Sequence, residues 1–258
     1  MSQDLGHHDG RPDIGDGMVS IMTTEQRTIA FVIYPGLTPL DIVGPLQVLA
    51  GLAAFVPEYR VAVVAANTEK MPSDSGLLLA AEYTFDEVPD PFIVVVPGGM
   101  TPTLAAMTDE RLLRYLRESA SGAHLMTSVC TGALLLGAAG LLEGRRATTH
   151  WMFVTVLAAL GATPARERWV QDGPVLTAAG VAAGIDMALH LAQQLEGEEV
   201  ARRIQTMIEY DPEPPLGSID WSTVDIPGYT PVLEQTMREA LGEHPELLEK
   251  LVARLPRG

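Results

Sequence analysis

Four short apolar runs recur along the first half of the chain, and each ends in a turn or leads into a helical pattern. Their β-branched and aromatic content, with Pro-Gly at the end of two of them, predicts buried strands. The runs 29–34 and 92–96 are apolar at both alternating positions, as expected of strands that helices cover on both faces. The four predicted strands are 28–36 (TIAFVIYPG), 60–67 (RVAVVAAN), 91–99 (PFIVVVPGG) and 123–130 (AHLMTSVC).

Amphipathic helical patterns separate these strands, at 40–54, 108–121 and 131–142. This alternation of strands and helices predicts βαβ units, a mostly parallel sheet and right-handed crossovers, which together define an α/β fold. Further along, 151–162 and 181–195 predict two more helices. The segment 169–180 (WVQDGPVLTAAG) predicts a strand pair around an Asp-Gly turn.

The two ends of the chain differ from this core. Residues 1–26 are rich in Gly, Asp, His and Ser, which predicts a flexible leader, and either Met18 or Met22 is a candidate start. In such a polar leader, the pair His7 and His8 is not expected to form a metal site. The α/β domain is expected over 27–215, up to the proline-rich segment EYDPEPP. A helical extension is expected over 216–258, with helical patterns near 231–241 and 246–255.

Composition narrows the possible partners and the compartment. The chain has 33 acidic and 17 basic side chains, a net charge of −16, which disfavours binding to a nucleic-acid backbone. No apolar run reaches the ~18–20 residues of a membrane-spanning helix, and the N-terminus lacks the pattern of a secretory signal. These features and the single cysteine predict a cytoplasmic protein without a disulfide.

That cysteine, Cys130, lies where an apolar strand runs into a Gly- and Ala-rich helix, in the sequence SVCTG. This arrangement is typical of a nucleophile elbow, in which Gly132 leaves room for the sharp turn. A sulfur at a helix N-terminus is expected to favour the thiolate, so the pattern predicts a low pKa. The alternative is a buried, inert cysteine.

Asp41 opens an otherwise apolar helix just after the first strand. It either caps that helix or favours its dipole, or, as a desolvated carboxylate near the thiol, it exchanges protons with a pKa raised toward neutrality. The amides of Gly98 and Gly99, in the loop after the third strand, are candidates to stabilise developing negative charge. By itself, a Gly-Gly loop is weak evidence for this role.

The remaining histidines are weaker candidates. His150, beside Trp151, lines a binding site, lies at a subunit contact or has a structural role. His190 follows Asp186 by four residues, which predicts a local pair on one helix. His124 is expected at an edge or in the core. No His, Cys or Asp cluster has the spacing of a metal site, and the Gly-Gly loop lacks the Lys of a phosphate loop.

At these residues the sequence resembles the ThiJ/PfpI superfamily and, within it, the isonitrile (isocyanide) hydratases. The segments that carry the resemblance span most of residues 28 to 215; they are 34–49, 95–99, 128–151, 177–192 and 208–215. Asp41 stands where many members have Glu, and the ending IEYDPEPP also points to the hydratases. Thr131 stands where peptidase-like members have His, so peptidase activity is not expected.

The resemblance implies a flavodoxin-like fold, a homodimer and hydration of an organic isonitrile to an N-substituted formamide without a cofactor. Cys130 would attack the isonitrile carbon to form a thioimidate, with Asp41 as general acid and base and Thr131 beside them. Amides near Gly99 and Thr131 would polarise the reacting group. Two alternatives stay open: a ligand- or redox-sensing protein, or a glyoxalase-like enzyme acting on a reactive aldehyde. The fold also serves AraC-like regulators, whose DNA-binding domain the short, acidic tail does not resemble.

Overall fold

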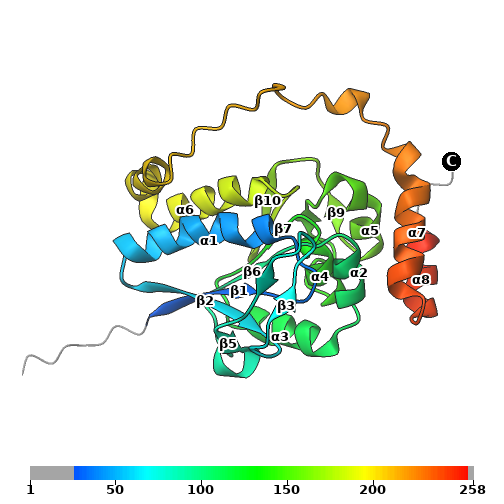
Figure 1. Ribbon diagram of the computed structural model, residues 1–258, viewed down its shortest axis with the longest axis horizontal. Helices are drawn as coiled ribbons and strands as arrows, with labels where there is room; N and C mark the ends of the chain where they lie inside the picture. Colours follow the sequence, from blue (N-terminus) through cyan, green and yellow to red (C-terminus); the bar gives the residue numbers. More distant parts are fainter. Residues whose placement is uncertain (1–25, 255–258) are drawn as a thin grey trace, which may run out of the picture.

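The computed structural model describes residues 26–254, and a seven-stranded sheet forms its centre (Figure 1). The strand order is β10-β11-β7-β6-β1-β2-β5, and all neighbours are parallel except the β10–β11 hairpin. The mostly parallel sheet of the sequence-based expectation is therefore confirmed. Its strands are β1 (Arg27–Val32), β2 (Tyr59–Ala65), β5 (Tyr83–Thr84), β6 (Ile93–Val96), β7 (Leu125–Val129), β10 (Trp169–Asp172) and β11 (Val175–Ala178).

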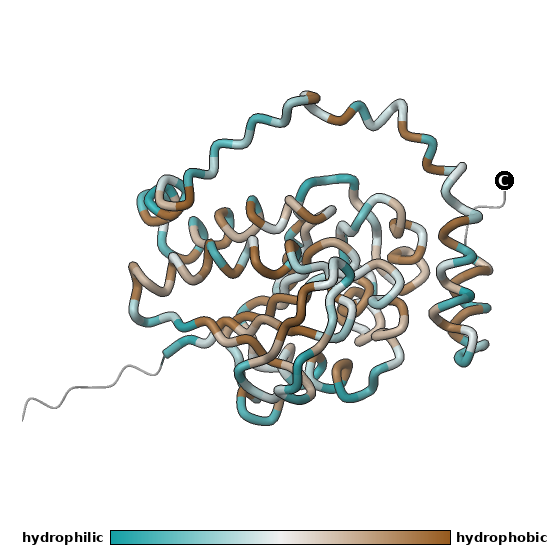
Figure 2. The backbone as a smooth tube through the Cα atoms, in the orientation of Figure 1, coloured by the Kyte–Doolittle hydropathy of each residue, from teal (hydrophilic) through white to brown (hydrophobic). Residues whose placement is uncertain are grey.

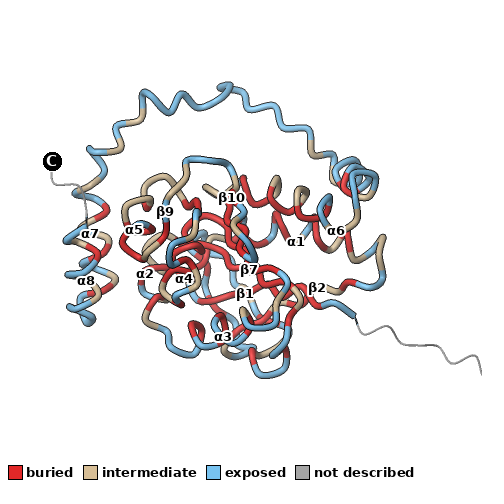
Figure 3. Tube along the Cα trace, turned by 180° about the vertical axis from the view of Figure 1, so that it is seen from behind, coloured by how far each residue is buried: buried red, intermediate tan, exposed pale blue. Residues whose placement is uncertain are grey.

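Helices cover both faces of the sheet. Figure 1 shows α1 (Pro39–Phe55) and α6 (Ala183–Met207) side by side on one face and α3 (Glu110–Ala120) on the other. The central strands are apolar and buried, as Figures 2 and 3 show, because neither of their faces reaches water. The remaining helices are α2 (Thr101–Ala106), α4 (Gly132–Ala138), α5 (Val154–Ala159), α7 (Thr230–Leu241) and α8 (Pro245–Val252), with short 3-10 turns η1 (Phe85–Glu87), η2 (Trp151–Phe153), η3 (Trp221–Thr223) and η4 (Pro227–Tyr229).

Several elements differ from the sequence-based expectation. The helix α2 and two small two-stranded pairings, β3 (Met71–Pro72) with β4 (Leu78–Leu79) and β8 (Arg146–Ala147) with β9 (Thr163–Pro164), were not expected. The helix expected at 181–195 continues to Met207 through a non-helical Gly197. The leader, with His7, His8, Met18 and Met22, lies outside the described residues except for its last position.

The chain leaves α6 and crosses to α7 as an exposed arch (Figures 1 and 3). Every residue of the segment 211–223, which we call the arch, is exposed. Beyond it, α7 and α8 pack against α2 and α5, so the two expected helical patterns of the extension do form helices. No helix within residues 26–254 is long and apolar enough to cross a membrane.

Candidate active site

The candidate residues lie in three segments that follow the carboxyl ends of neighbouring strands. Asp41 follows β1, Gly98 and Gly99 follow β6, and Cys130 follows β7. The crossover from β1 leads to β2 on one side, whereas β6 and β7 lie on the other. The candidate residues therefore meet where the strand order reverses, the usual position of ligand sites in open α/β sheets.

The backbone at Cys130 forms the strained turn expected of a nucleophile elbow. Its φ is +57°, in the left-handed region that non-glycine residues rarely occupy. Its N–H donates to the carbonyl oxygen of Ala179, 2.8 Å away. A Cβ on Gly132 would overlap the carbonyl oxygen of Val96 at the end of β6. Only glycine therefore fits there, and the sequence-based interpretation of Gly132 agrees with this geometry.

Asp41 does not cap its helix. It is the third residue of α1, Thr38 occupies the cap position, and the Asp41 Oδ2 accepts a hydrogen bond from the N–H of Gly98 at 2.9 Å. The carboxyl group is fully buried, and its Oδ1 has no hydrogen-bond partner among the described residues. Burial raises the pKa of Asp41 to about 7, against the opposing effect of the Gly98 N–H. The structure thus excludes the cap and supports the desolvated carboxylate, which also lies in the first turn of α1, where its charge suits the helix dipole.

The thiol of Cys130 differs from the sequence-based expectation of a low pKa. Burial raises its pKa, and the negative charge of Asp41 raises it further. The amides of Thr131 and Val181 act in the opposite direction without reversing the shift. The expected thiolate is wrong because the loss of water and the charge of Asp41 together outweigh the amides that favour the ionised sulfur. The pair therefore holds its proton on sulfur while Asp41 titrates near neutrality.

The amides of Gly98 and Gly99 already have acceptors inside the protein. The Gly98 N–H donates to Asp41, and the Gly99 N–H donates to the Thr131 Oγ1 at 3.0 Å. Thr131 also accepts from the N–H of Met100 at 3.3 Å. These amides hold Asp41 and Thr131 in place, in contrast to the expected role as donors to a reacting group. Sequence reasoning missed this because each acceptor comes from a distant segment.

His150 lies in a segment that is tied to both the elbow and the hairpin. The Thr149 hydroxyl donates to the carbonyl oxygen of Cys130 at 2.9 Å. The His150 ring packs beside Gly180, the neighbour of Val181, and its buried Nδ1 has no partner among the described residues. Burial lowers the pKa of His150, so the ring is held neutral. These contacts bring His150 close to residues 179–181, the segment whose Val181 amide acts on the sulfur.

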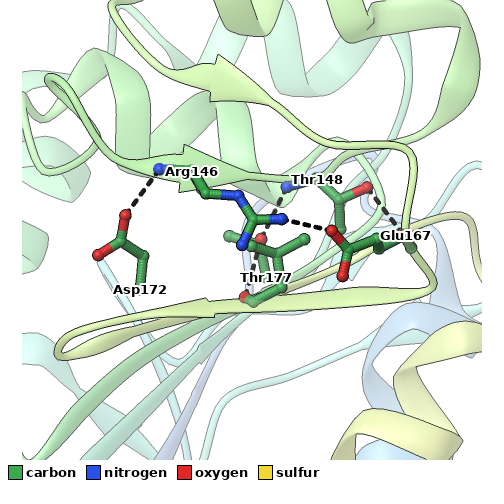
Figure 4. Close-up of polar contacts among 6 residues, drawn as sticks. Arg146, Thr148, Glu167, Asp172 and Thr177 are labelled. Atoms are coloured by element: carbon green, nitrogen blue, oxygen red, sulfur yellow. Dashed lines mark hydrogen bonds and ion pairs between the residues drawn. The ribbon is translucent and has the colours of Figure 1, made fainter.

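Polar contacts with the β10–β11 hairpin fix the segment before His150 (Figure 4). The Arg146 N–H donates to the Asp172 carboxylate at 2.8 Å, and the Arg146 side chain pairs with Glu167. The Thr148 N–H donates to the Thr177 hydroxyl at 2.9 Å, and the Thr148 hydroxyl donates to the Glu167 carbonyl oxygen. No local sequence pattern predicts these contacts, because they join segments that are distant in the sequence.

The other histidines lie away from this arrangement. His190 does not pair with Asp186, which instead binds Arg168 and accepts from the Tyr210 hydroxyl at 2.9 Å. The expected local pair is therefore wrong, and the His190 ring lies against Trp169. His124 is exposed and stacks on Phe92. No group of three or more metal-ligating side chains occurs within residues 26–254.

Comparison with known proteins identifies the family. Residues 27–194, which include Asp41, the Gly-Gly loop and the elbow, match the DJ-1/PfpI family. The chain belongs to the DJ-1/PfpI family. A THiJ/PfpI family protein from Pseudomonas syringae has a similar structure, with a TM-score of 0.75 and 34% identity over 96% of this chain and 98% of that one. The flavodoxin-like fold implied by the resemblance is thus confirmed.

Relatives in the DJ-1/PfpI family have different activities. An isonitrile hydratase from Pseudomonas putida is 44% identical over 190 residues, which are 74% of this chain and 81% of that protein. An HTH-type transcriptional regulator, CdhR, from Pseudomonas aeruginosa is 29% identical over 67% of this chain and 52% of its own length. Membership of the family therefore does not by itself separate catalysis from regulation.

Proposed function

We propose that the protein hydrates an organic isonitrile to the N-substituted formamide. The observation that carries this proposal is the buried pair of Asp41 and Cys130, in which a carboxylate that titrates near pH 7 faces a thiol that keeps its proton. Such a pair suits a substrate that must receive both a nucleophile and a proton. The similarity to an isonitrile hydratase supports the choice of substrate.

In the first half of the proposed reaction, ionised Asp41 takes the thiol proton as sulfur attacks the terminal carbon of the isonitrile. A C–S bond forms, and Asp41 returns the proton to the same carbon. The product is a thioimidate, R–N=CH–S–Cys130, and Asp41 is again a carboxylate. The amides of Thr131 and Val181, which act on the sulfur, stabilise the charge that develops there.

In the second half, Asp41 takes a proton from water as the water oxygen attacks the thioimidate carbon. The proton passes to the substrate nitrogen. The hydroxyl group of the resulting tetrahedral intermediate then gives up its proton, which Asp41 transfers to sulfur as the C–S bond breaks and the carbonyl group forms. The products are R–NH–CHO and the free thiol, so one water is consumed and no cofactor is required. His150, whose Nδ1 has no partner within residues 26–254 and whose pKa burial lowers, is proposed to contact the substrate.

The test is incubation of the purified protein with one aromatic and one aliphatic isonitrile while the N-substituted formamide is quantified. We expect formamide in proportion to the isonitrile consumed, with ¹⁸O from labelled water in its carbonyl group. Absence of turnover with both substrates would overturn the proposal. Binding without turnover, or oxidation of Cys130 by mild peroxide, would then favour the sensing alternative, and turnover of a reactive aldehyde would favour the glyoxalase-like one.

We also propose that the protein is a cytoplasmic homodimer. Large apolar side chains are exposed in the first turns of α1 and on the arch, where Leu40 and Val43 are 44% exposed and Leu216 is 96% exposed. Such exposure is unfavourable in water, and a second copy of the chain would cover it. Sedimentation of the purified protein tests the homodimer, and fractionation of cells that make the protein tests its compartment.

A further inference from the structure

A chain of buried hydroxyl groups runs beside the candidate site without entering the proposed chemistry. The Tyr34 hydroxyl lies 2.9 Å from the carbonyl oxygen of Pro97 and 2.9 Å from the Thr103 hydroxyl. The Thr103 hydroxyl lies 2.9 Å from that of Thr131. All three side chains are buried, and burial raises the pKa of Tyr34, so its hydroxyl keeps its proton.

The donor and the acceptor of each hydrogen bond in this chain of hydroxyl groups follow from the carbonyl oxygen at one end. A carbonyl oxygen only accepts, so Tyr34 donates its one proton to Pro97. Thr103 must therefore donate to Tyr34, and Thr131 must donate to Thr103. The remaining lone pairs of the Thr131 oxygen then face the N–H groups of Gly99 and Met100, which donate to it. One proton orientation satisfies all the groups.

Both ends of this chain of hydroxyl groups bind the same loop, residues 97–100. Tyr34 binds the Pro97 carbonyl oxygen, and Thr131 binds the amides of Gly99 and Met100. Between them lies Gly98, whose N–H holds the Asp41 carboxylate. The loop needs this support because Met100 has a φ of +49°, a conformation that costs free energy in a non-glycine residue.

We propose that Tyr34 and Thr103 are positioning residues, which fix the loop 97–100 and through Gly98 set the orientation and ionisation of Asp41. Loss of the Thr103 hydroxyl removes the acceptor of Thr131. Loss of the Tyr34 hydroxyl removes the acceptor of Thr103 and the donor to the Pro97 carbonyl oxygen. In both variants the loop loses support, and the Gly98 N–H moves from Asp41. Cys130 and Asp74 act on the pKa of Asp41, and both variants keep them. Tyr34, whose own pKa Asp41 raises, keeps its proton and is uncharged where Asp41 titrates, so its removal takes no charge from the site. The first ionisation of the Asp41–Cys130 pair should then need a higher pH, since a donor to the carboxylate is lost.

The experiment compares Tyr34→Phe and Thr103→Val with two matched controls. Tyr115→Phe removes another buried tyrosine hydroxyl that donates to a carbonyl oxygen, that of Val88. Thr127→Val removes another buried threonine hydroxyl, which donates to Val94. The first readout is the pH dependence of Cys130 alkylation by iodoacetamide, which needs no isonitrile. The second is kcat and KM for isonitrile hydration, and this readout alone rests on the proposed function.

In Tyr34→Phe and Thr103→Val we expect the first rise in alkylation to move up by about 0.5–1 pH unit, and kcat to fall by about tenfold with little change in KM. The controls should match wild type in both readouts, and Thr103→Ser, which keeps the hydroxyl, should restore them. Alkylation profiles of Tyr34→Phe and Thr103→Val that superimpose on wild type would overturn the inference, whether or not isonitriles are substrates. If Thr103→Val does not fold, the alkylation profiles of Tyr34→Phe and Thr103→Ser still test the inference.

Discussion

The elbow region and the C-terminal extension are held in place by different forces. At the elbow, buried polar atoms from distant segments satisfy one another, as when Gly98 holds Asp41 across 57 residues of sequence. The extension instead packs through buried apolar side chains of α7 and α8, among them Met237 and Leu251. Since hydrogen bonds are directional and apolar burial is not, the elbow should be sensitive to single atoms and the extension to buried volume.

The sharpest test of the elbow is Cys130→Ser. We expect isonitrile turnover to fall below detection, because a serine hydroxyl in a site that already disfavours the thiolate is a much weaker nucleophile. The melting temperature should stay within a few degrees of wild type, since serine is similar in size and shape. Formamide production within a few-fold of wild type would exclude a covalent step at residue 130.

Asp41→Asn changes one atom of the same region. Asparagine still offers an oxygen to the Gly98 N–H but does not titrate. Turnover should fall by ~10²–10⁴-fold, the usual contribution of a general acid or base. Asp90→Asn, at an exposed position, is the matched control and should keep the wild-type rate. Near-normal turnover in Asp41→Asn would rule out proton transfer by this residue.

The contrast also explains which parts of the fold the sequence predicts. The apolar strands around Phe31 and Val95 and the Asp172–Gly173 turn follow from local patterns and occur as predicted. The helix α2 was missed because its six residues carry too little periodicity. The small β3–β4 and β8–β9 pairings depend on contacts between segments, which no local pattern records.

The candidate site shows the same limit. Proximity of Asp41, Gly98 and Cys130 follows from the strand order, and the raised pKa of Asp41 follows from its apolar surroundings. The sequence does not predict that the amides of Gly98 and Gly99 are occupied, because their acceptors become neighbours only in the folded chain. The pKa of Cys130 was misjudged since helix position is visible in a sequence, whereas desolvation is not.

Stability should depend on pH through Asp41. Its pKa in the folded protein is about 7, above its usual value of 3.8, so between these values the folded state binds the extra proton. The free energy of unfolding should therefore fall as pH rises from about 4 to 7. Asp41→Asn lacks this loss, so the free energy of unfolding of the variant relative to wild type should rise between pH 4 and 8, by at most about 4 kcal/mol. Urea unfolding at pH 4, 6 and 8 measures the difference, and parallel curves would contradict a raised pKa.

For the extension, Met237→Ala should act on stability alone. Met237 is fully buried in α7, and its truncation should lower the free energy of unfolding by about 2–5 kcal/mol through lost burial and a cavity. The kcat of the remaining folded protein and the alkylation of Cys130 should match wild type. Denaturant unfolding and a steady-state assay check the two parts. A selective loss of kcat would show that the extension takes part in the site.

The smallest effect on folding is expected for Leu216→Ser on the arch. Leu216 is 96% exposed, so the substitution removes almost no packing within the chain, and the free energy of unfolding of the single subunit should change by less than ~0.5 kcal/mol. If a second copy covers the arch, the same change should weaken the dimer, because it removes an apolar side chain from the interface. Sedimentation across a range of protein concentrations separates the two effects. Lys70→Ser, at an exposed polar position away from the arch, serves as the control. An unchanged dimer affinity in Leu216→Ser would remove the arch from the proposed interface.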